Sequence, residues 1–556
     1  MLDKSPTESA EQLAVHDPRG YPPAIMAKEP AKRLPSLDGR TVYLVDSRFD
    51  DSVELLKQVA DWFARNMPSV TTKLVQLSGT YAQDDPELWE EIRDKGDAAI
   101  VGVGHCSTCA PAVSTHAITL ESKYGVPTVA VHTEKFVRVV RSVVRVGGLP
   151  QARLVFVPQP VMGRTAEELR AYVEGNDPAT GEPVMREIVE GLTGALPPVE
   201  EKLAKAPDLS KNRFVPEASE DELHELFLEQ GWTDKLPIVL PTKARVEAML
   251  AGTNRKPDEI VGRMQPTKNR GLWSYTVEKV AVNAVMAGAK PEYLPVILAL
   301  AASGVSARGS SSSSAATMSV VNGPVRTEIG MNCGIGAMGP YSHANATIGR
   351  AYSLLSQNLQ GGSVPNETFM GSLGSNYTYN GLCFAENEER SPWEPMHVQK
   401  GYAADQSTVT IFSGCRSTTF SLGLREKGWR EHVSDMLRGT DAITAPILVL
   451  DPICARQFIE RGGFESKAEL MQWLHDAAVM PAGRFWDLQL VQNYIYPRAT
   501  FGEEPYASRL KAVPDEEIPM FRLEDIHVIV TGGEANGYWQ IYGAKPQATV
   551  LVDDWR

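Results

Sequence analysis

The first part of the chain alternates between short apolar segments and amphipathic segments, and this alternation constrains the fold more than any other feature. Segments 41–47, 71–79, 97–104 and 126–133 are rich in β-branched residues, and segments with apolar residues at helical spacing separate them. The third segment, DAAIVGVG, is apolar throughout, as expected of a strand covered on both faces. This order predicts a flavodoxin-like, doubly wound parallel sheet over residues 38–164.

The length of the chain indicates more than one domain, because 556 residues exceed the usual size of a single domain. Residues 1–37 are polar and contain several prolines, so they are predicted to form an arm. Residues 165–220 are predicted to be a partly helical connector. Residues 221–556 are predicted to form a larger α/β (α+β) domain that holds a substrate pocket, with a long apolar helix over 277–302.

Charge and cysteine content narrow the class of protein. A formal net charge of −14 argues against nucleic acid or an anionic membrane as the main partner. Six cysteines are too few for a disulfide scaffold, and no apolar run is long enough to span a membrane. No signal peptide is recognisable at the start. We therefore expect a cytoplasmic protein with reduced thiols that acts on a small molecule and forms a homo-oligomer.

The stretch VGVGHCSTCAP carries the first candidate site. Cys106 and Cys109 fall where a predicted strand ends and a helix begins, which is the edge of an α/β sheet where ligands bind. A helix N-terminus favours thiolate over thiol, and the Cys-x-x-Cys spacing lets one sulfur attack and the other resolve the adduct. His105 is the adjacent candidate helper. Two buried structural thiols, or half of a metal site, remain as alternatives.

The stretch CFAENEERSPWEPMH carries a second candidate site. Glu386 and His397 are catalytic candidates because a carboxylate and an imidazole can transfer protons or bind a hard metal ion. The alternative is a solvated acidic turn. Upstream, a segment dense in glycine and asparagine suggests a pocket that grips a carboxylate or carbonyl group. The candidate substrate-binding residues are Asn332, Cys333, His343, Asn345, Arg350 and Cys383. A later glycine turn, TGGEANGYWQIYG, is a candidate for closing the same pocket.

GHCSTCAP followed by GVPTVAVHTEKF resembles the UGSC family, which is named for a selenocysteine-Gly-Ser-Cys motif at this junction. Cys106 stands at the selenocysteine position and Cys109 at the cysteine position, while Ser107 and Thr108 replace Gly and Ser. The resemblance implies thiol or selenol redox chemistry. GWTDKLPIVLPT and CFAENEERSPWEPMHVQKGY resemble a largely uncharacterised bacterial domain that is often fused to UGSC domains and brings no established reaction with it.

Three functional hypotheses follow. The first is a thiol-dependent oxidoreductase for a small substrate with a carboxylate as candidate recognition group, in which Cys106 attacks, Cys109 resolves and an external thiol reductant resets the pair. The second is a nonredox lyase, hydratase or isomerase that uses one cysteine. The third is a metal-binding or thiol-sensing protein without turnover. No cofactor is firmly implied, and a metal ion enters only with the third hypothesis or with the Glu386 site.

Overall fold

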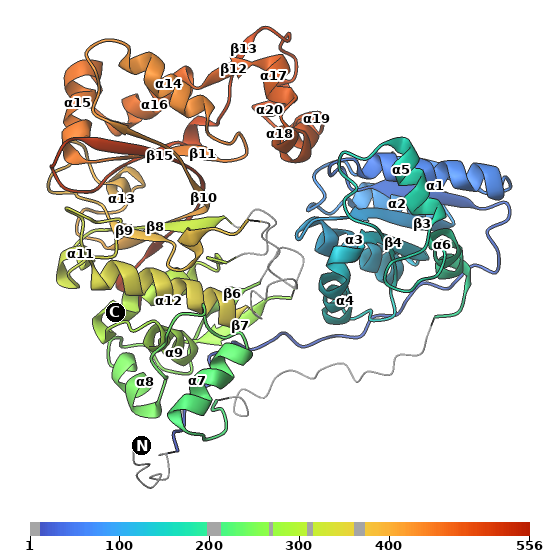
Figure 1. Cartoon of the computed structure of the whole chain (residues 1–556), viewed down its shortest axis with the longest axis horizontal. Coiled ribbons are helices and arrows are strands. Elements are labelled where there is room, and N and C mark those ends of the chain that lie inside the picture. The colour runs from blue at the N-terminus through green and yellow to red at the C-terminus, as the bar shows by residue number, and fades with distance from the viewer. Residues whose placement is uncertain (1–11, 197–212, 266–270, 309–314, 361–372) are drawn as a thin grey trace, which may run out of the picture.

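The N-terminal domain is a five-stranded parallel sheet, which confirms the flavodoxin-like prediction (Figure 1). The computed structural model describes residues 12–196, 213–265, 271–308, 315–360 and 373–556. The strand order is β2-β1-β3-β4-β5, and every neighbouring pair is parallel. The strands are β1 (Thr41–Asp46), β2 (Thr71–Gln76), β3 (Ala98–Gly104), β4 (Thr128–Thr133) and β5 (Arg153–Val157).

Helices cover both faces of this sheet, which explains why its central strands are apolar throughout. They are α1 (Ser52–Asn66), α2 (Pro86–Lys95), α3 (Cys109–Tyr124), α4 (Val137–Val146), α5 (Ala166–Glu174) and α6 (Val184–Thr193), with a 3₁₀ turn, η1 (Glu134–Phe136), before α4. Leu169 of α5 and Ile188 of α6 are fully buried against the sheet. The domain therefore extends past the predicted boundary at 164, and the first half of the predicted connector is core. Residues 197–212 of that connector lie outside the described part.

The predicted N-terminal arm is a strap that contacts both domains. Val15 is fully buried in the core of the C-terminal domain, and Tyr21 pairs with Ser274 there. Further along, the Glu121 carboxylate of α3 accepts hydrogen bonds from the backbone N–H of Ala31 (2.8 Å) and from Arg33 Nη1 (2.7 Å). The strap therefore links the two domains through packing at one end and a buried ion pair at the other.

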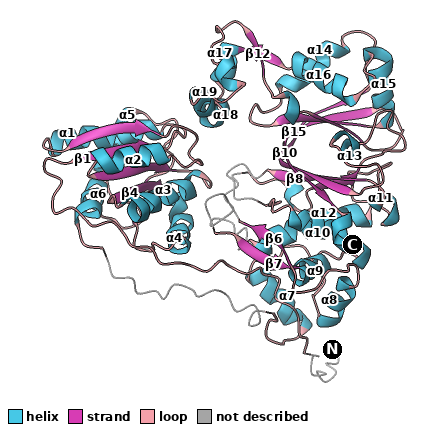
Figure 2. Cartoon of the chain, turned by 180° about the vertical axis from the view of Figure 1, so that it is seen from behind, coloured by secondary structure: helices cyan, strands magenta, loops and turns pink. Residues whose placement is uncertain are grey.

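The C-terminal domain contains a mixed sheet of six strands (Figure 2). Its order is β14-β11-β15-β10-β8-β9, with β8–β9 and β11–β14 parallel and the other pairs antiparallel. The strands are β8 (Ala316–Asn322), β9 (Leu382–Ala385), β10 (Thr408–Leu422), β11 (Ala445–Leu450), β14 (His527–Val530) and β15 (Tyr538–Leu551). Two small antiparallel sheets pair β6 (Ile260–Met264) with β7 (Trp273–Thr276) and β12 (Val479–Pro481) with β13 (Glu517–Pro519).

Two groups of helices pack on different parts of the large sheet. The first packs with β8 and β10 and comprises α9 (Val277–Met286), α10 (Leu294–Ala302) and α12 (His343–Leu359). The second packs with β11, β14 and β15 and comprises α14 (Trp429–Arg438), α15 (Pro452–Gly462) and α16 (Lys467–Ala477). The remaining helices are α7 (Glu220–Glu229), α8 (Lys243–Leu250), α11 (Val325–Glu328), α13 (Met396–Gln399), α17 (Ala482–Trp486), α18 (Gln489–Tyr494), α19 (Tyr496–Thr500) and α20 (Tyr506–Arg509), with 3₁₀ turns η2 (Pro291–Tyr293), η3 (Asn376–Thr378), η4 (Leu523–Asp525) and η5 (Asp553–Trp555).

The long helix predicted over 277–302 is two helices. The helix is interrupted between α9 and α10 by Gly288, which has a φ of 79°, and by Pro291, which begins a 3₁₀ turn. Every residue of α9 is buried, including its polar residues Glu278, Lys279 and Asn283. The apolar residues of this helix therefore pack in the core and form no exposed surface. In the described part of the chain, no helix is long and apolar enough to cross a membrane.

The helices α18 and α19 of the C-terminal domain lie beside the N-terminal domain in both views (Figures 1 and 2), and hydrogen bonds join them to it. Asp50 and Asn493 form two hydrogen bonds. The Asp50 N–H donates to Asn493 Oδ1 (3.1 Å), and Asn493 Nδ2 donates to Asp50 Oδ1 (2.7 Å). Arg48 Nη2 donates to Thr500 Oγ1 (2.9 Å). Residues 48–50 follow β1, so this contact lies at the carboxyl edge of the parallel sheet.

Candidate functional site

The two thiols of the Cys-x-x-Cys motif lie at the topological switch point of the parallel sheet. β3 pairs with β1 on one side and β4 on the other, and Cys106 and Cys109 follow β3 directly. A crevice forms at this point in such sheets because the chain leaves β1 and β3 toward opposite sides. Cys109 is the first residue of α3, so both sulfurs lie at a helix N-terminus, as the sequence predicted.

Hydrogen bonds make the two thiols chemically different. The N–H of Cys109 donates to Cys106 Sγ (2.9 Å), and the N–H of Cys106 donates to Cys109 Sγ (2.8 Å). Burial acts to raise the pKa of Cys106, but hydrogen bonds from Cys109 and Thr108 outweigh it and leave this pKa lowered. Burial, followed by the interaction with Cys106, raises the pKa of Cys109 well above the ordinary range. The two thiols are therefore inequivalent, because Cys106 loses its proton at a lower pH than Cys109.

A hydroxyl relay reaches the Cys106 sulfur. Thr108 Oγ1 lies 3.4 Å from Cys106 Sγ and 2.7 Å from Tyr81 Oη. The Tyr81 backbone carbonyl in turn accepts a hydrogen bond from His116 Nε2 (2.7 Å). When Tyr81 donates to Thr108, the threonine hydroxyl can donate to Cys106 Sγ. His116 therefore acts on the site only by holding the chain at Tyr81.

Aromatic side chains cover the thiol site, and one of them comes from the C-terminal domain. Phe49 and Tyr81 pack around Cys106, with Tyr494 of α18 against both of them at ring-centroid distances of 5.9 and 6.1 Å. Cys106 is consequently only 6% exposed. The predicted helper His105 lies in the same wall, but its Nε2 donates to the Phe49 carbonyl (3.1 Å), and burial lowers its pKa.

Removing the Tyr494 ring should expose the thiol. We expect Tyr494→Ala to raise the rate at which iodoacetamide alkylates Cys106 several-fold, because the ring covers the pocket without bonding to the sulfur. The rate can be followed by peptide mass spectrometry. Tyr496→Ala is the matched control, since the Tyr496 ring packs on Trp486 at 6.1 Å instead. An unchanged rate in Tyr494→Ala would show that another element controls access.

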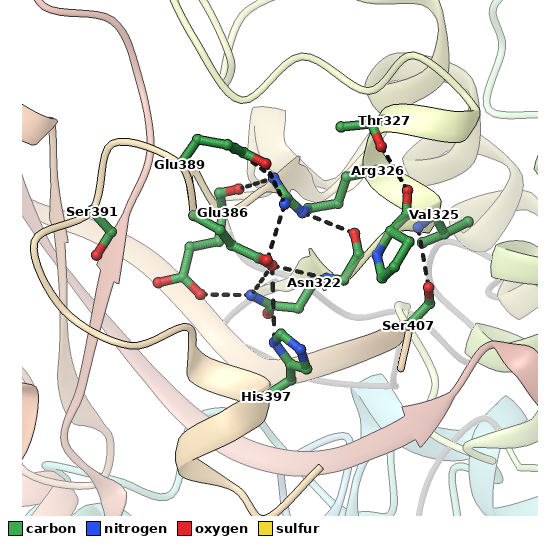
Figure 3. A network of polar contacts seen from close by, with 12 residues as sticks. Asn322, Val325, Arg326, Thr327, Glu386, Glu389, Ser391, His397 and Ser407 are labelled. Carbon is green, nitrogen blue, oxygen red and sulfur yellow. Dashed lines mark hydrogen bonds and ion pairs between the residues drawn. The ribbon is translucent and has the colours of Figure 1, made fainter. Parts of the chain in front are cut away.

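The second candidate site is a buried network of charged side chains (Figure 3). Glu386 and Lys467 are both fully buried, and Lys467 Nζ lies 2.5 Å from Glu386 Oε1. The other carboxylate oxygen of Glu386 accepts from Asn322 Nδ2 (2.6 Å) and from the N–H of Met396 (2.8 Å). Arg326 joins the network by donating to the carbonyl of Glu386 (2.8 Å).

His397 lies in this network, so the structure brings both predicted residues together. Its Nδ1 is 3.9 Å from Glu388 Oε1, and neither ring nitrogen has a hydrogen-bond partner in the described part of the chain. The acidic turn is therefore not simply solvated. However, His397, Glu386 and Lys467 are all 0% exposed, so no substrate reaches them in this conformation. The network instead ties β8, β9, α13 and α16 together.

The two glycine-rich segments meet at one cavity. Residues 335–339 and 531–533 line a cavity of about 290 Å³ together with apolar side chains such as Leu450 and Trp539. The Gly532 N–H donates to the Cys333 carbonyl (2.9 Å), which joins the two segments. The two glycine-rich segments therefore lie next to each other at one cavity, although the wall of this cavity is mainly apolar.

Most of the remaining predicted substrate-binding residues have hydrogen-bond or ion-pair partners within the chain. Asn345 holds the glycine segment through bonds to the carbonyls of Asn332 (2.8 Å) and Ala337 (3.0 Å). Arg350 makes a two-pronged ion pair with Asp234, at 2.9 Å for each contact, so its guanidinium already has a carboxylate. His343 Nδ1 lies 3.4 Å from Tyr293 Oη. Cys383 lies in β9, and burial raises its pKa to about 12.

Three residues around Cys106 were missed by the sequence reasoning. Phe49 and Tyr81 follow β1 and β2, so the predicted sheet already placed them at the carboxyl edge beside Cys106, and that signal could have found them. Tyr494 had no such signal, because nothing in the local sequence connects α18 with β3.

Among the described residues, no group of three or more His, Cys, Asp or Glu side chains is arranged to hold a metal ion.

Comparison with known proteins identifies one part of the chain. Residues 14–182 match the model of the UGSC family. This range contains the parallel sheet, both thiols, α5 and most of the strap. No curated protein and no solved structure matches the chain.

Proposed function

Since residues 14–182 form a UGSC-family domain, we propose that this protein is a thiol-dependent enzyme in which Cys106 is the nucleophile and Cys109 the resolving thiol. One observation carries the proposal: the two sulfurs exchange backbone hydrogen bonds, yet the pKa of Cys106 is lowered and that of Cys109 is raised. A dithiol that acts in two steps needs this division, because the first sulfur must attack as a thiolate while the second stays protonated.

The proposed reaction reduces a small substrate. The Cys106 thiolate attacks an electrophilic atom, a bond to Sγ forms, and the bond that breaks leaves its electron pair on the departing group. Cys109 then loses its proton and attacks Cys106 Sγ, so that a disulfide forms and the remaining fragment departs with the electron pair and takes up the proton. The substrate gains two electrons and the dithiol loses two. An external dithiol restores the reduced pair.

The hydroxyl at position 108 supports this assignment. Thr108 stands where the family motif has serine, and both side chains offer a hydroxyl that can donate to the Cys106 sulfur. Asp46 is also buried at this edge of the sheet. Its carboxylate accepts hydrogen bonds from Ser52, Gln76 and the N–H of Arg48, and burial raises its pKa. We therefore assign stabilisation of the Cys106 thiolate to its hydrogen bonds and not to the charge of a neighbouring side chain.

The test is the pH profile of alkylation of Cys106. Its lowered pKa means that the thiolate forms at a lower pH, so the reaction with iodoacetamide should rise at lower pH than for Cys333. Cys333 is a half-buried reference thiol whose pKa is raised, mainly by burial. Thr108→Val should shift the Cys106 profile to higher pH, whereas Thr108→Ser should retain it. A Cys106 that reacts only after unfolding, or with the profile of Cys333, would contradict the proposal.

A further inference from the structure

A cavity of about 360 Å³ lies between the two domains and shares Tyr494 with the thiol site. Its N-terminal wall contains Thr80 and Gln83, which follow β2. Its C-terminal wall contains residues of α18 and α19, the segment 521–525 and Lys545 of β15. A crevice between two domains is a preferred place for a small ligand.

Three cations from separate segments line this cavity. Arg498 is paired with Glu503, with Nε 2.7 Å from Oε2, and Arg522 is paired with Glu524, with Nε 2.6 Å from Oε1. The Lys545 ammonium has no hydrogen bond or ion pair within the described part of the chain. Lys545 is therefore a cation in the cavity wall without a carboxylate of its own.

The electrostatics around Lys545 favour an added anion. Lys545 is exposed at the mouth of the cavity. Partial burial of its ammonium group nevertheless lowers its pKa, and the charges of Arg498 and Arg522 lower this pKa further, while Asp525 acts in the opposite direction. Asp525 is the only acidic side chain among the described lining residues, and burial raises its pKa against the influence of Arg522 and Lys545. Glu503 and Glu524 already pair with the two arginines, so a carboxylate from outside would pair first with Lys545, the lining cation to which the described residues offer no ion pair.

The cavity is continuous with the residues that cover Cys106. The ring of Tyr494 lines the cavity and contacts Phe49 and Tyr81 over the thiol. Burial and then the charge of Cys106 raise the pKa of Tyr494, which places the two groups in one electrostatic environment. Thr80 lines the cavity next to Tyr81, whose hydroxyl contacts Thr108. A ligand in the cavity would therefore contact Tyr494, one of the aromatic residues that cover Cys106.

We propose that this cavity is the carboxylate subsite of the thiol enzyme. A small carboxylic acid places its anionic group at Lys545, with Arg498 and Arg522 beside it, and extends past Tyr494 to Cys106. The inference rests on the proposed function and names its substrate class. It places recognition of the carboxylate on side chains of the C-terminal domain, opposite the nucleophile, so that both domains complete one site.

The test measures malonate binding to the full chain and its effect on Cys106. Malonate is a small dicarboxylate, and malonamide is its neutral counterpart. At constant ionic strength, malonate should raise the unfolding temperature and slow the alkylation of Cys106 by iodoacetamide, whereas malonamide should do neither. Lys545→Gln should weaken malonate binding about tenfold, as expected for the loss of one contact to a charged group. Lys511→Gln, an exposed lysine away from the cavity, should leave binding unchanged.

The outcomes separate this inference from the proposed function. Malonate binding should persist in Cys106→Ser, because the subsite does not include the sulfur. If Cys106 proves unreactive but malonate still binds through Lys545, the function fails and the anion subsite stands. If Cys106 is reactive but Lys545→Gln binds malonate as well as the wild type, the subsite is overturned. Binding that leaves the alkylation rate unchanged would also overturn it, because the cavity would then be separate from the thiol.

Discussion

Cys106→Ser is expected to lose all dithiol chemistry while keeping the fold. Serine has nearly the shape of cysteine, but its hydroxyl is not a nucleophile at neutral pH, so no adduct can form at position 106. The assay exposes the protein to hydroxyethyl disulfide, a small neutral disulfide, and follows the products by mass spectrometry. The wild type should form a reversible Cys106–Cys109 disulfide, and Cys106→Ser should form neither adduct nor disulfide at this site.

The companion variant Cys109→Ala separates the redox mechanism from a nonredox one. Without the resolving thiol, the mixed disulfide at Cys106 should accumulate. The variant keeps the backbone N–H that donates to Cys106 Sγ, but it removes the side-chain hydrogen bond from the Cys109 thiol, which also lowers the pKa of Cys106. The reaction should therefore begin roughly tenfold more slowly at neutral pH, since a hydrogen bond to a charged atom contributes about 1.5 kcal/mol. Cys454→Ala is the control, because this buried thiol lies in α15 and not at the switch point. A Cys106 adduct in the wild type that never resolves to a disulfide would point instead to a lyase, hydratase or isomerase.

Lys467→Met is expected to destabilise the C-terminal domain by about 3–5 kcal/mol, the usual cost of leaving one member of a buried ion pair without its partner. Lys467 and Glu386 are both 0% exposed, so water cannot take over the role of the ammonium group. Denaturant unfolding followed by tryptophan fluorescence measures the change, with the domain transitions analysed separately. The same experiment tests whether the network is structural.

Two further variants sharpen this result. Glu386→Gln combined with Lys467→Met removes both charges, so it should cost less than Lys467→Met alone. Lys511→Met, at an exposed position, should leave the unfolding curve unchanged. If Lys467→Met unfolds like the wild type, the carboxylate of Glu386 does not depend on this ion pair, and the network would return as a candidate site for proton transfer.

The parallel sheet was predictable from the sequence because its signal is local. Each strand is a short β-branched run, each helix has apolar residues at helical spacing, and their alternation leaves few topologies. The same logic placed Cys106 and Cys109 at a ligand-binding edge and at a helix N-terminus, where the structure has them. The structure differs from the prediction at two places, because α5 and α6 add to the core beyond residue 164 and because Gly288 and Pro291 divide the helix expected over 277–302. Both differences depend on which helix faces find a partner in the packed molecule.

The C-terminal candidates show what sequence chemistry alone cannot decide. Glu386 and His397 were predicted as catalytic candidates, and only the packed structure shows that both lie in one network that is closed to solvent. Arg350 has the right side chain to hold a substrate carboxylate, but Asp234, far away in sequence, already pairs with it. The cations that line the interdomain cavity lie in stretches that carry no motif.

The sequence by itself determined where the two thiols lie, at the junction of a strand and a helix, and the sheet that presents them, because these depend on residues close together in the chain. Only the tertiary structure decided what surrounds Cys106. Tyr494 covers Cys106 and Lys545 faces the shared cavity because two domains dock. Docking depends on the shape and charge of whole surfaces, and no spacing along the chain encodes these properties.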